Sequence, residues 1–334
     1  MRGYKIDRGS SRRKRNLFAL LRPVLLVAVL ATAAYLIFRP APPAPGGANL
    51  QSGDLAAPFA FRTTTPGIVA GDPNPQGAQE ATTQPVVATA DPGLPLKGRR
   101  VGLDPGHGPR EDMGAVLVSS DGTELILSEA EFNLDIALRS RAILEARGAS
   151  VVLTRESEDT FTAPWPADVN GDGKTGEYSD DLQLRVDILN NFGAEAFLSI
   201  HANGGERNTA ARQDVQVLYC GAPDCVTPDR NRQLSQLVLD RLLPDMRALG
   251  YPVGGEILTD LAIDSSDPPQ HLFVLGPTNG PRHVRATSMP GALAESLYIT
   301  YEEHAALLKR DDVRQMIAGA YADALQAFLT GTGE

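Results

Sequence analysis

The sequence predicts an α/β fold, in which helices flank a twisted central β-sheet within a single folded domain. Short apolar runs typical of strands alternate with segments of helical apolar spacing from residue 97 onward. Apolar residues make up 42% and charged residues 22% of the 334 residues, which is ordinary for a soluble core and enough for one or two domains. No repeat or bias indicates collagen, a coiled coil or disorder along the whole length.

The elements follow in a regular order. Apolar runs predict strands at 99–104, 150–154, 196–200, 214–219 and 291–296. Apolar residues at helical spacing predict helices at 129–147, 182–192, 231–249 and 313–329. Gly148 and Gly193 supply stop signals for the first two helices. In sheets of this kind, ligands gather beyond the strand ends.

Residues 1–38 are predicted to form a basic cytoplasmic tail and a membrane anchor. Four basic residues at 12–15 precede a largely apolar run at 17–38, which as a helix would reach roughly 33 Å, about the thickness of the hydrocarbon core. The basic flank predicts a single-pass protein of the cytoplasmic membrane whose remaining chain is extracytoplasmic. A cleaved signal peptide is the alternative.

Residues 39–95 are predicted to be a disordered linker, and residues 96–330 the folded domain. The linker is rich in Pro, Gly, Ala and Thr and lacks apolar periodicity, so it cannot offset its ordering entropy by burial. Basic residues concentrate in 1–39, and the whole chain still carries a net charge of −10. The folded part is therefore acidic and a poor partner for nucleic acid.

Two histidines lie where predicted strands end. His107 follows the run at 101–106, and His201 follows the run at 197–200. Both are expected to point into the crevice at the sheet edge, where neutral imidazole is the commonest zinc ligand. A carboxylate is the expected third ligand, and Glu129 begins a helix between them in sequence. Taken alone, a histidine at such a position is more often a structural residue than a metal ligand.

Six short motifs occur in order through the domain: Asp-Pro-Gly-His-Gly at 104–108, a Glu-initiated helix at 129–137, Thr-Arg at 154–155, Leu-x-x-Arg at 182–185, Ser-Ile-His-Ala-Asn at 199–203 and Pro-x-x-Leu-x-Glu at 290–295. With these motifs, residues 97–329 resemble the zinc-dependent N-acetylmuramoyl-L-alanine amidases (amidase type 3). The family commonly has Gly-Phe-x-Ser-Asn after its last motif. Here 296–301 keep the apolar pattern without the Asn.

The resemblance implies that His107, Glu129 and His201 are zinc ligands and that Glu295 is the catalytic acid/base. Glu131 is the alternative to Glu129, and either residue could simply complement the helix dipole. Zinc would activate water and polarise an amide carbonyl, while Glu295 would carry the proton to the leaving amine. The implied reaction cleaves peptidoglycan between N-acetylmuramic acid and the L-alanine of the stem peptide. The alternatives are a zinc peptidase acting within the stem peptide and a non-catalytic cell-wall binding module.

Residues near the motifs receive weaker assignments. Asp104 and Asn203 are candidates for orienting the ligand imidazoles. Arg155 and Arg185 are expected to pair with acids and hold helices to the sheet. Their positions within the motifs give no reason to place them on substrate.

Three further features lie outside the motifs. Asp168, Asn170 and Asp172 match the first half of an EF-hand-type loop within an apparent insertion at 156–181, which predicts either a structural Ca²⁺ site or a polar turn cluster. Cys220 and Cys225 are expected to form a disulfide outside the cytoplasm. His271 and His283 flank a Gly/Pro-rich loop at 276–280 and are expected either to be surface histidines or to line the cleft, and His304 is expected to be a surface histidine.

Overall fold

The computed structural model describes residues 93–108, 112–157, 167–205, 207, 214–250 and 253–332. The expected anchor (1–38) and all but the last three residues of the expected linker (39–95) lie outside these described residues. Within the described ranges, no helix has the length and apolarity needed to cross a bilayer.

A mostly parallel six-stranded sheet forms the centre of the fold. Its strand order is β4-β1-β5-β8-β6-β7, with bounds β1 (Arg100–Pro105), β4 (Ser150–Leu153), β5 (Ala196–Asn203), β6 (Val215–Tyr219), β7 (Gly255–Thr259) and β8 (Gly291–Tyr298). The first four strands in this order are parallel, whereas β6 runs antiparallel to β8 and parallel to β7. A separate antiparallel pair, β2 (Val116–Val118) and β3 (Leu125–Ser128), precedes the first helix.

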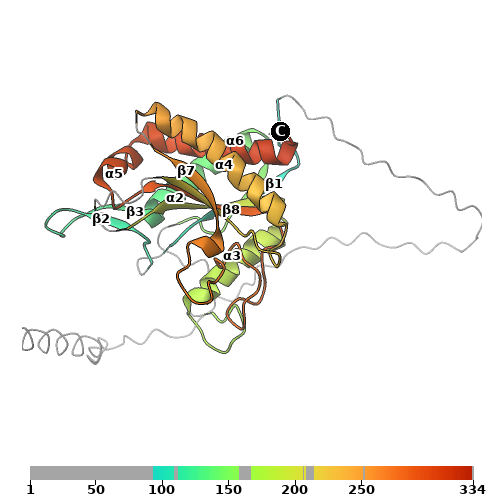
Figure 1. Cartoon of the computed structure of the whole chain (residues 1–334). Helices are drawn as coiled ribbons and strands as arrows, with labels where there is room; N and C mark the ends of the chain where they lie inside the picture. Colours follow the sequence, from blue (N-terminus) through green and yellow to red (C-terminus); the bar gives the residue numbers. More distant parts are fainter. Residues whose placement is uncertain are drawn as a thin grey trace, which may run out of the picture. The chain divides into compact units, whose positions relative to one another are not determined.

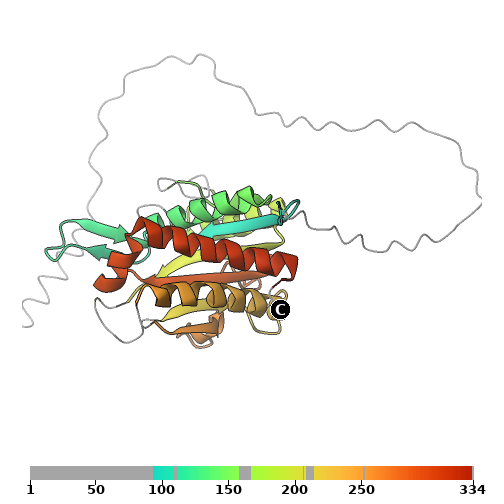
Figure 2. The same ribbon diagram turned by 90° about the horizontal axis from the view of Figure 1, so that it is seen from above.

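Helices cover the two faces of the sheet unequally. α2 (Glu129–Ala146), α4 (Pro228–Ala248) and α6 (Asp311–Thr330) lie on one face, and α3 (Tyr178–Phe192) lies on the other (Figure 1). Figure 2 shows α6 between α2 and α4. The short α5 (Glu302–Leu308) and a 3-10 turn, η1 (Asp260–Ala262), complete the described elements.

Apolar side chains that alternate between the two faces of the central strands form a hydrophobic core on each face of the sheet. In β5, Leu198 and Ile200 belong to the large cluster under α2, α4 and α6, whereas Phe197 packs with Leu189 of α3. This follows from the period of two in a strand, which sends successive side chains to opposite faces. Because both faces are covered, the strand reads as a continuous apolar run.

The structure confirms the α/β fold with a central sheet flanked by helices, and it adds elements that the pattern did not predict. β2, β3, β7 and α5 are short or only partly buried, so their apolar periodicity is weak. α3 begins at Tyr178 instead of 182 because the Asp180 carboxylate accepts the Glu177 backbone N–H (3.2 Å) and stabilises the helix start.

Candidate metal centre

His107 lies in a strained turn at the end of β1. Its φ is 59°, in the left-handed region that non-glycine residues rarely adopt. Two buried arginines hold this turn. Arg155 donates to Pro105 O (2.9 Å) and Gly106 O (3.1 Å), and Arg185 donates to Pro105 O (2.8 Å) and His107 O (2.6 Å). Arg185 also pairs with the acids Asp104 and Asp181, as expected. Arg155 also donates to Ala130 O in the first turn of α2 (2.7 Å), so it holds that helix to the turn through backbone carbonyls.

Glu129 is placed by the start of α2. Ser128 caps the helix by accepting the Glu131 N–H through its side chain. The Glu129 carboxylate then faces inward, where its Oε2 accepts the Ala115 N–H (2.8 Å). Its Oε1 lies 2.8 Å from His201 Nδ1 and 3.2 Å from His107 Nε2. One carboxylate oxygen therefore joins two histidines that are far apart in the sequence.

Two glycines leave room for this convergence. A Cβ at Gly106 would overlap the His201 ring, and a Cβ at Gly114 would overlap Glu129 Oε2 and the His107 ring. Gly114 also has a φ of +66°, which favours glycine. Both positions bring backbone so close to the ligating side chains that only glycine fits.

The donor set suits zinc. One ligand atom from each of His107, Glu129 and His201 lies within 4.8 Å of the other two, and the imidazole rings approach edge to face with centroids 5.0 Å apart. Two imidazoles and a carboxylate form a catalytic zinc ligand set that leaves one position open. The structure brings together the three residues that the sequence singled out.

Charge in the site also favours a cation. Burial alone would lower the pKa of His107, but hydrogen bonds to Asp112 and Glu129 raise that pKa to about 10. Burial would raise the pKa of Glu129, and the two histidines hold that pKa well below its usual range. The carboxylates therefore stabilise positive charge at the point where the donors meet.

Asp112 is a site residue that sequence reasoning missed. Its Oδ1 lies 3.0 Å from His107 Nδ1, so Nδ1 donates to it and Nε2 is directed toward Glu129. Gly108 N donates to Asp112 O (3.0 Å), which folds the loop back onto the histidine. The only available sequence signal was its nearness to the histidine motif, and nothing in that spacing predicts the fold-back.

The two residues expected to orient the imidazoles have other partners. Asn203 Nδ2 donates to Gln216 Oε1 (2.9 Å), so this prediction was wrong, because the end of β5 turns that side chain toward β6. Asp104 accepts from Ser199 Oγ (2.7 Å) and Arg185 Nη1 (3.0 Å). Among the described residues, neither Asp104 nor Asn203 hydrogen-bonds an imidazole, and Asp104 acts on the site through the arginine.

Glu131 lies away from the metal centre. Its side chain is 47% exposed and lies 3.7 Å from Arg314 Nη1. Because it is two residues beyond Glu129 on a helix, it points away from the face that Glu129 occupies. The structure thus favours Glu129 of the two alternatives.

Glu295 lies beside the metal centre on β8. In the parallel register its Cα pairs with that of His201 on β5, so the two side chains lie side by side on the same face of the sheet. Its Oε2 is shielded from solvent, and no hydrogen-bond partner for it is found among the described residues. Burial and the negative charge of Glu129 raise the pKa of Glu295 to about 7, against the opposing charge of the histidines. A carboxylate in this state can both take up and release a proton near neutral pH.

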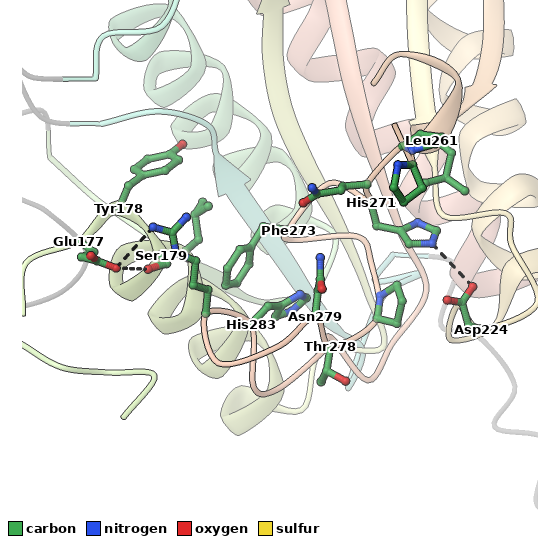
Figure 3. Close-up of a pocket in the computed structure, with 16 residues that line it drawn as sticks. Glu177, Tyr178, Ser179, Asp224, Leu261, His271, Phe273, Thr278, Asn279 and His283 are labelled. Atoms are coloured by element: carbon green, nitrogen blue, oxygen red, sulfur yellow. Dashed lines mark hydrogen bonds and ion pairs between the residues drawn. The ribbon is translucent and has the colours of Figure 1, made fainter. Parts of the chain in front are cut away.

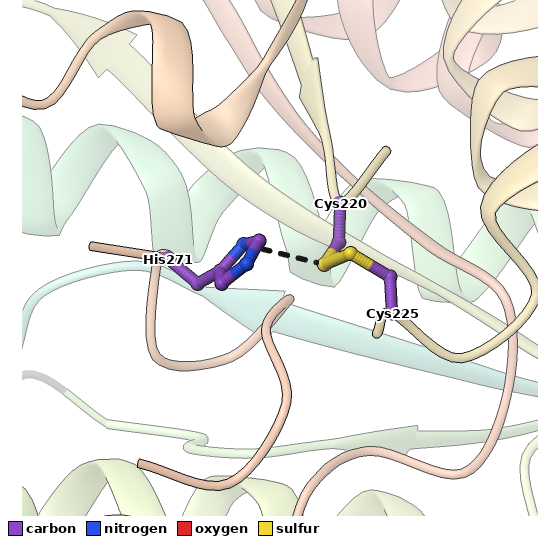
Figure 4. A group of neighbouring side chains, drawn as sticks. All are labelled: Cys220, Cys225 and His271. Carbon is purple, nitrogen blue, oxygen red and sulfur yellow. Dashed lines mark hydrogen bonds between the residues drawn. A yellow bond between two sulfur atoms is a disulfide. The ribbon is translucent and has the colours of Figure 1, made fainter. Parts of the chain in front are cut away.

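Cys220, Cys225 and His271 form a second group of candidate metal ligands, but its two cysteines are joined in a disulfide. Cys220 and Cys225 are bonded to each other with their Cα atoms 5.7 Å apart, which confirms the expected pairing. His271 Nδ1 lies 3.5 Å from Cys220 Sγ (Figure 4) and 2.9 Å from the buried Asp260 Oδ2. Because both sulfurs are in the disulfide, they are not available as thiolate ligands.

The structure gives the calcium prediction no support. Asp168 accepts the Gly171 N–H (2.7 Å) and the Gly173 N–H (3.0 Å). Asn170 Oδ1 accepts the Asp172 N–H (3.0 Å), and Asp172 in turn accepts that of Lys174 (2.9 Å). The oxygens are used by hydrogen bonds within the loop, as in the alternative of a polar turn cluster.

The prediction of a surface histidine was wrong for His304, whereas His271 and His283 line a cavity, which was the alternative for these two residues. His283 is 4% exposed and stacks on Phe273 with ring centroids 4.0 Å apart. His304 is fully buried at the start of α5, where its Nδ1 accepts the Tyr298 N–H (3.3 Å), and burial lowers its pKa to about 4. These contacts come from α5 and a long loop, neither of which has a clear sequence pattern. His271 is half-buried beside the disulfide.

Comparison with known proteins agrees with the geometry. Residues 101–327 match the family model described as N-acetylmuramoyl-L-alanine amidase. The germination-specific N-acetylmuramoyl-L-alanine amidase of Bacillus subtilis is 41% identical over 110 residues, which cover 33% of this chain and 41% of that relative. AmiA of Escherichia coli is 28% identical over 253 residues, covering 69% of this chain and 76% of AmiA.

Solved structures share the fold. The CwlD amidase from Clostridioides difficile, solved in complex with the GerS lipoprotein, has a TM-score of 0.51 and 23% sequence identity. The match covers 70% of this chain and 99% of CwlD. The folded part of the present chain therefore has the architecture of that whole catalytic chain.

Proposed function

The chain belongs to the N-acetylmuramoyl-L-alanine amidase family, and we propose that it hydrolyses the amide between N-acetylmuramic acid and the L-alanine of the peptidoglycan stem peptide. The observation that carries the proposal is the convergence of His107, Glu129 and His201 within 4.8 Å. Glu295 lies next to them on the neighbouring strand. A family fold with this intact site has the groups that amide hydrolysis needs.

His107, Glu129 and His201 are the residues that would hold zinc. When bound, zinc supplies Lewis acidity, which polarises a carbonyl and acidifies water. Asp112 fixes the orientation of the His107 ring, and Arg155 and Arg185 fix the turn that carries it. These contacts prepare the ligands before the ion arrives, which lowers the cost of forming the site.

Glu295 is the residue that would move the proton. Its shielded carboxylate accepts a proton from the attacking water and returns it to the nitrogen of the leaving L-alanine. The bond broken is the amide C–N bond, and the bond formed joins the water oxygen to the lactyl carbonyl carbon. The products are a free lactyl carboxylate on muramic acid and a peptide with a free amino terminus.

Product analysis of digested peptidoglycan tests this function. We expect the zinc-loaded protein to release peptides that begin with L-alanine and to leave muramic acid with a free lactyl carboxylate, both identified by mass spectrometry. Cleavage inside the stem peptide would instead establish the zinc peptidase. Binding to peptidoglycan without release of peptide would establish the non-catalytic module.

Replacement of a ligand histidine tests the metal centre. We expect His201→Ala to lower the zinc content from about one equivalent to a small fraction and to abolish turnover, because two protein ligands hold zinc far less tightly than three. Elemental analysis of the purified protein measures the zinc. Gln236→Ala, at an exposed position, is the control. His304→Ala is unsuitable as a control because His304 is buried. Full zinc content in His201→Ala would remove His201 from the ligand set.

We further propose that the domain works outside the cytoplasmic membrane, tethered by the N-terminal segment. The apolar run at 17–38 and its basic flank support this location, as does the disulfide, which persists in oxidising compartments. Thiol alkylation in whole cells tests it: Cys220 and Cys225 should react only after a reductant is added.

A further inference from the structure

A second cluster of side chains that bind soft metals lies away from the catalytic centre. Cys220 directly follows β6 and Cys225 lies in the loop before α4, whereas His271 follows η1 (Figure 4). One ligand atom from each lies within 4.8 Å of the other two. Gln216 on β6 pairs in register with Glu295 on β8, and Cys220 is four residues farther along, which is about 13 Å in the direction of the strand. The two clusters are therefore separate.

The two cysteines are held in place by more than their disulfide. Asn231 of α4 is 3% exposed, and its Nδ2 donates to Cys220 O (3.0 Å) and to Val226 O (2.8 Å), at the two ends of the loop. Cys225 N also donates to Ala222 O (3.1 Å). The disulfide closes a loop with a sequence separation of only 5, and short closed loops contribute least to stability. Breaking the S–S bond therefore leaves both cysteines in the same place.

Two carboxylates hold the His271 ring beside the sulfurs. Asp260 is fully buried, and its Oδ2 lies 2.9 Å from His271 Nδ1 and accepts the Leu272 N–H (3.2 Å). On the other side of the ring, His271 Nε2 lies 3.6 Å from Asp224 Oδ1 (Figure 3). A histidine that binds a metal through one nitrogen is oriented by a carboxylate at the other, and here each nitrogen has one. The two negative charges also attract a cation to this place.

We propose that reduction of the disulfide converts this cluster into a second zinc site, formed by Cys220, Cys225 and His271. Thiolate and imidazole are preferred ligands of zinc, and three protein ligands leave one position for water. Two sulfurs at tetrahedral positions around zinc lie about 3.8 Å apart. This separation is smaller than the 5.7 Å between the two Cα atoms, so rotation of the side chains alone produces it. The site does not depend on the proposed amidase function.

The conversion has two balanced steps. A dithiol reductant supplies two electrons and two protons and is oxidised to its own disulfide, while the S–S bond between Cys220 and Cys225 breaks to give two thiols. Zinc then displaces one proton from each thiol and forms two Zn–S bonds and one Zn–N bond.

Zinc would connect two loops that the disulfide leaves unconnected. The disulfide joins two positions within the loop between β6 and α4, whereas zinc also binds His271 in the segment between η1 and β8. His271 and Asp224 both line a cavity of about 680 Å³. The redox state of the cysteines therefore controls whether these two walls of the cavity are linked through a metal.

Zinc content in the two redox states tests the proposal. The full chain is loaded with zinc, either oxidised or reduced by a phosphine, which takes up the oxygen of water as it cleaves the S–S bond. Dialysis against a weak chelator removes loosely held metal. We expect about one equivalent of zinc in the oxidised chain and about two in the reduced chain. Alkylation after unfolding should count two thiols in the reduced chain alone. The same zinc content in both states would overturn the second site.

His201→Ala separates the two sites. This variant should hold little zinc when oxidised and about one equivalent when reduced. If the oxidised wild type binds no zinc and the reduced wild type binds one equivalent, the catalytic metal centre is wrong and the second site stands. No zinc in reduced His201→Ala would overturn the second site and leave the catalytic centre standing.

Cobalt(II) in place of zinc identifies the ligands. Thiolates give Co²⁺ an intense near-ultraviolet charge-transfer absorption that imidazole and carboxylate ligands do not give. We expect this absorption in the reduced chain alone, with cobalt affinity at least about 10-fold lower in reduced His271→Asn. The control is Gln270→Ala, an exposed neighbour whose backbone N–H keeps its bond to Asp264 (2.8 Å); it should match the wild type.

The comparison of redox states needs no substitution, so misfolding of a variant does not affect it. Circular dichroism of the reduced wild type checks that the fold is kept. Loss of the fold on reduction, absence of the charge-transfer absorption, or unchanged cobalt affinity in His271→Asn would each overturn the proposed site.

Discussion

Glu295→Gln is expected to keep zinc and fold while lowering kcat by at least about 100-fold. Gln has nearly the same shape as Glu but cannot take up a proton from water at neutral pH, and positioned general acid–base groups contribute roughly 10²–10⁴-fold. The position favours this role because the Glu295 carboxylate is shielded and its pKa is raised by burial to about 7. Steady-state kinetics on a muropeptide, with zinc measured on the same sample, provide the readout.

A matched substitution distinguishes catalysis from general disturbance. Glu145 is an exposed carboxylate on α2, so Glu145→Gln removes the same charge without entering the site and should leave kcat unchanged. If Glu295→Gln turns over at the wild-type rate with full zinc, another group carries the proton and the assigned role of Glu295 is wrong.

Arg185→Met is expected to lower the free energy of unfolding by about 3–5 kcal/mol, because it removes one partner of a buried ion-pair network. Arg185 lies 3.0 Å from Asp104 and 2.9 Å from Asp181, and all three side chains are at most 3% exposed. The variant would leave two buried carboxylates without their cation and would free the His107 carbonyl. Urea unfolding measures the loss, and the folded fraction should also bind zinc more weakly.

The comparison variant is an exposed arginine with a similar partner. Arg285 lies 2.7 Å from Asp187, but its side chain is 45% exposed. Solvent screens such a pair, so Arg285→Met should cost only about 1 kcal/mol or less. Equal losses in the two variants would show that burial of Arg185 does not control the stability of the turn.

The fold class could be predicted from local sequence patterns, whereas the three ligand residues and Glu295 were implied by the resemblance of six short motifs to the amidase family. His107 and His201 stand at the ends of predicted strands, and Glu129 stands at the start of a predicted helix. Such signals reside in a few consecutive residues, because strand and helix periodicity is a local property of the chain. The edge of the parallel sheet then brings these residues to one place.

The other features of the site depend on contacts between segments far apart in the sequence, which only the tertiary structure determines. Asp112 reaches His107 because a loop folds back, Asn203 turns toward Gln216, and His304 is buried by an unpredicted helix. Arg282 likewise lies 3.9 Å from Glu177, which precedes it by more than a hundred residues in the sequence. The apolar periodicity of the sequence does not predict such pairings, because each is fixed by packing and hydrogen bonding once the whole sheet has formed.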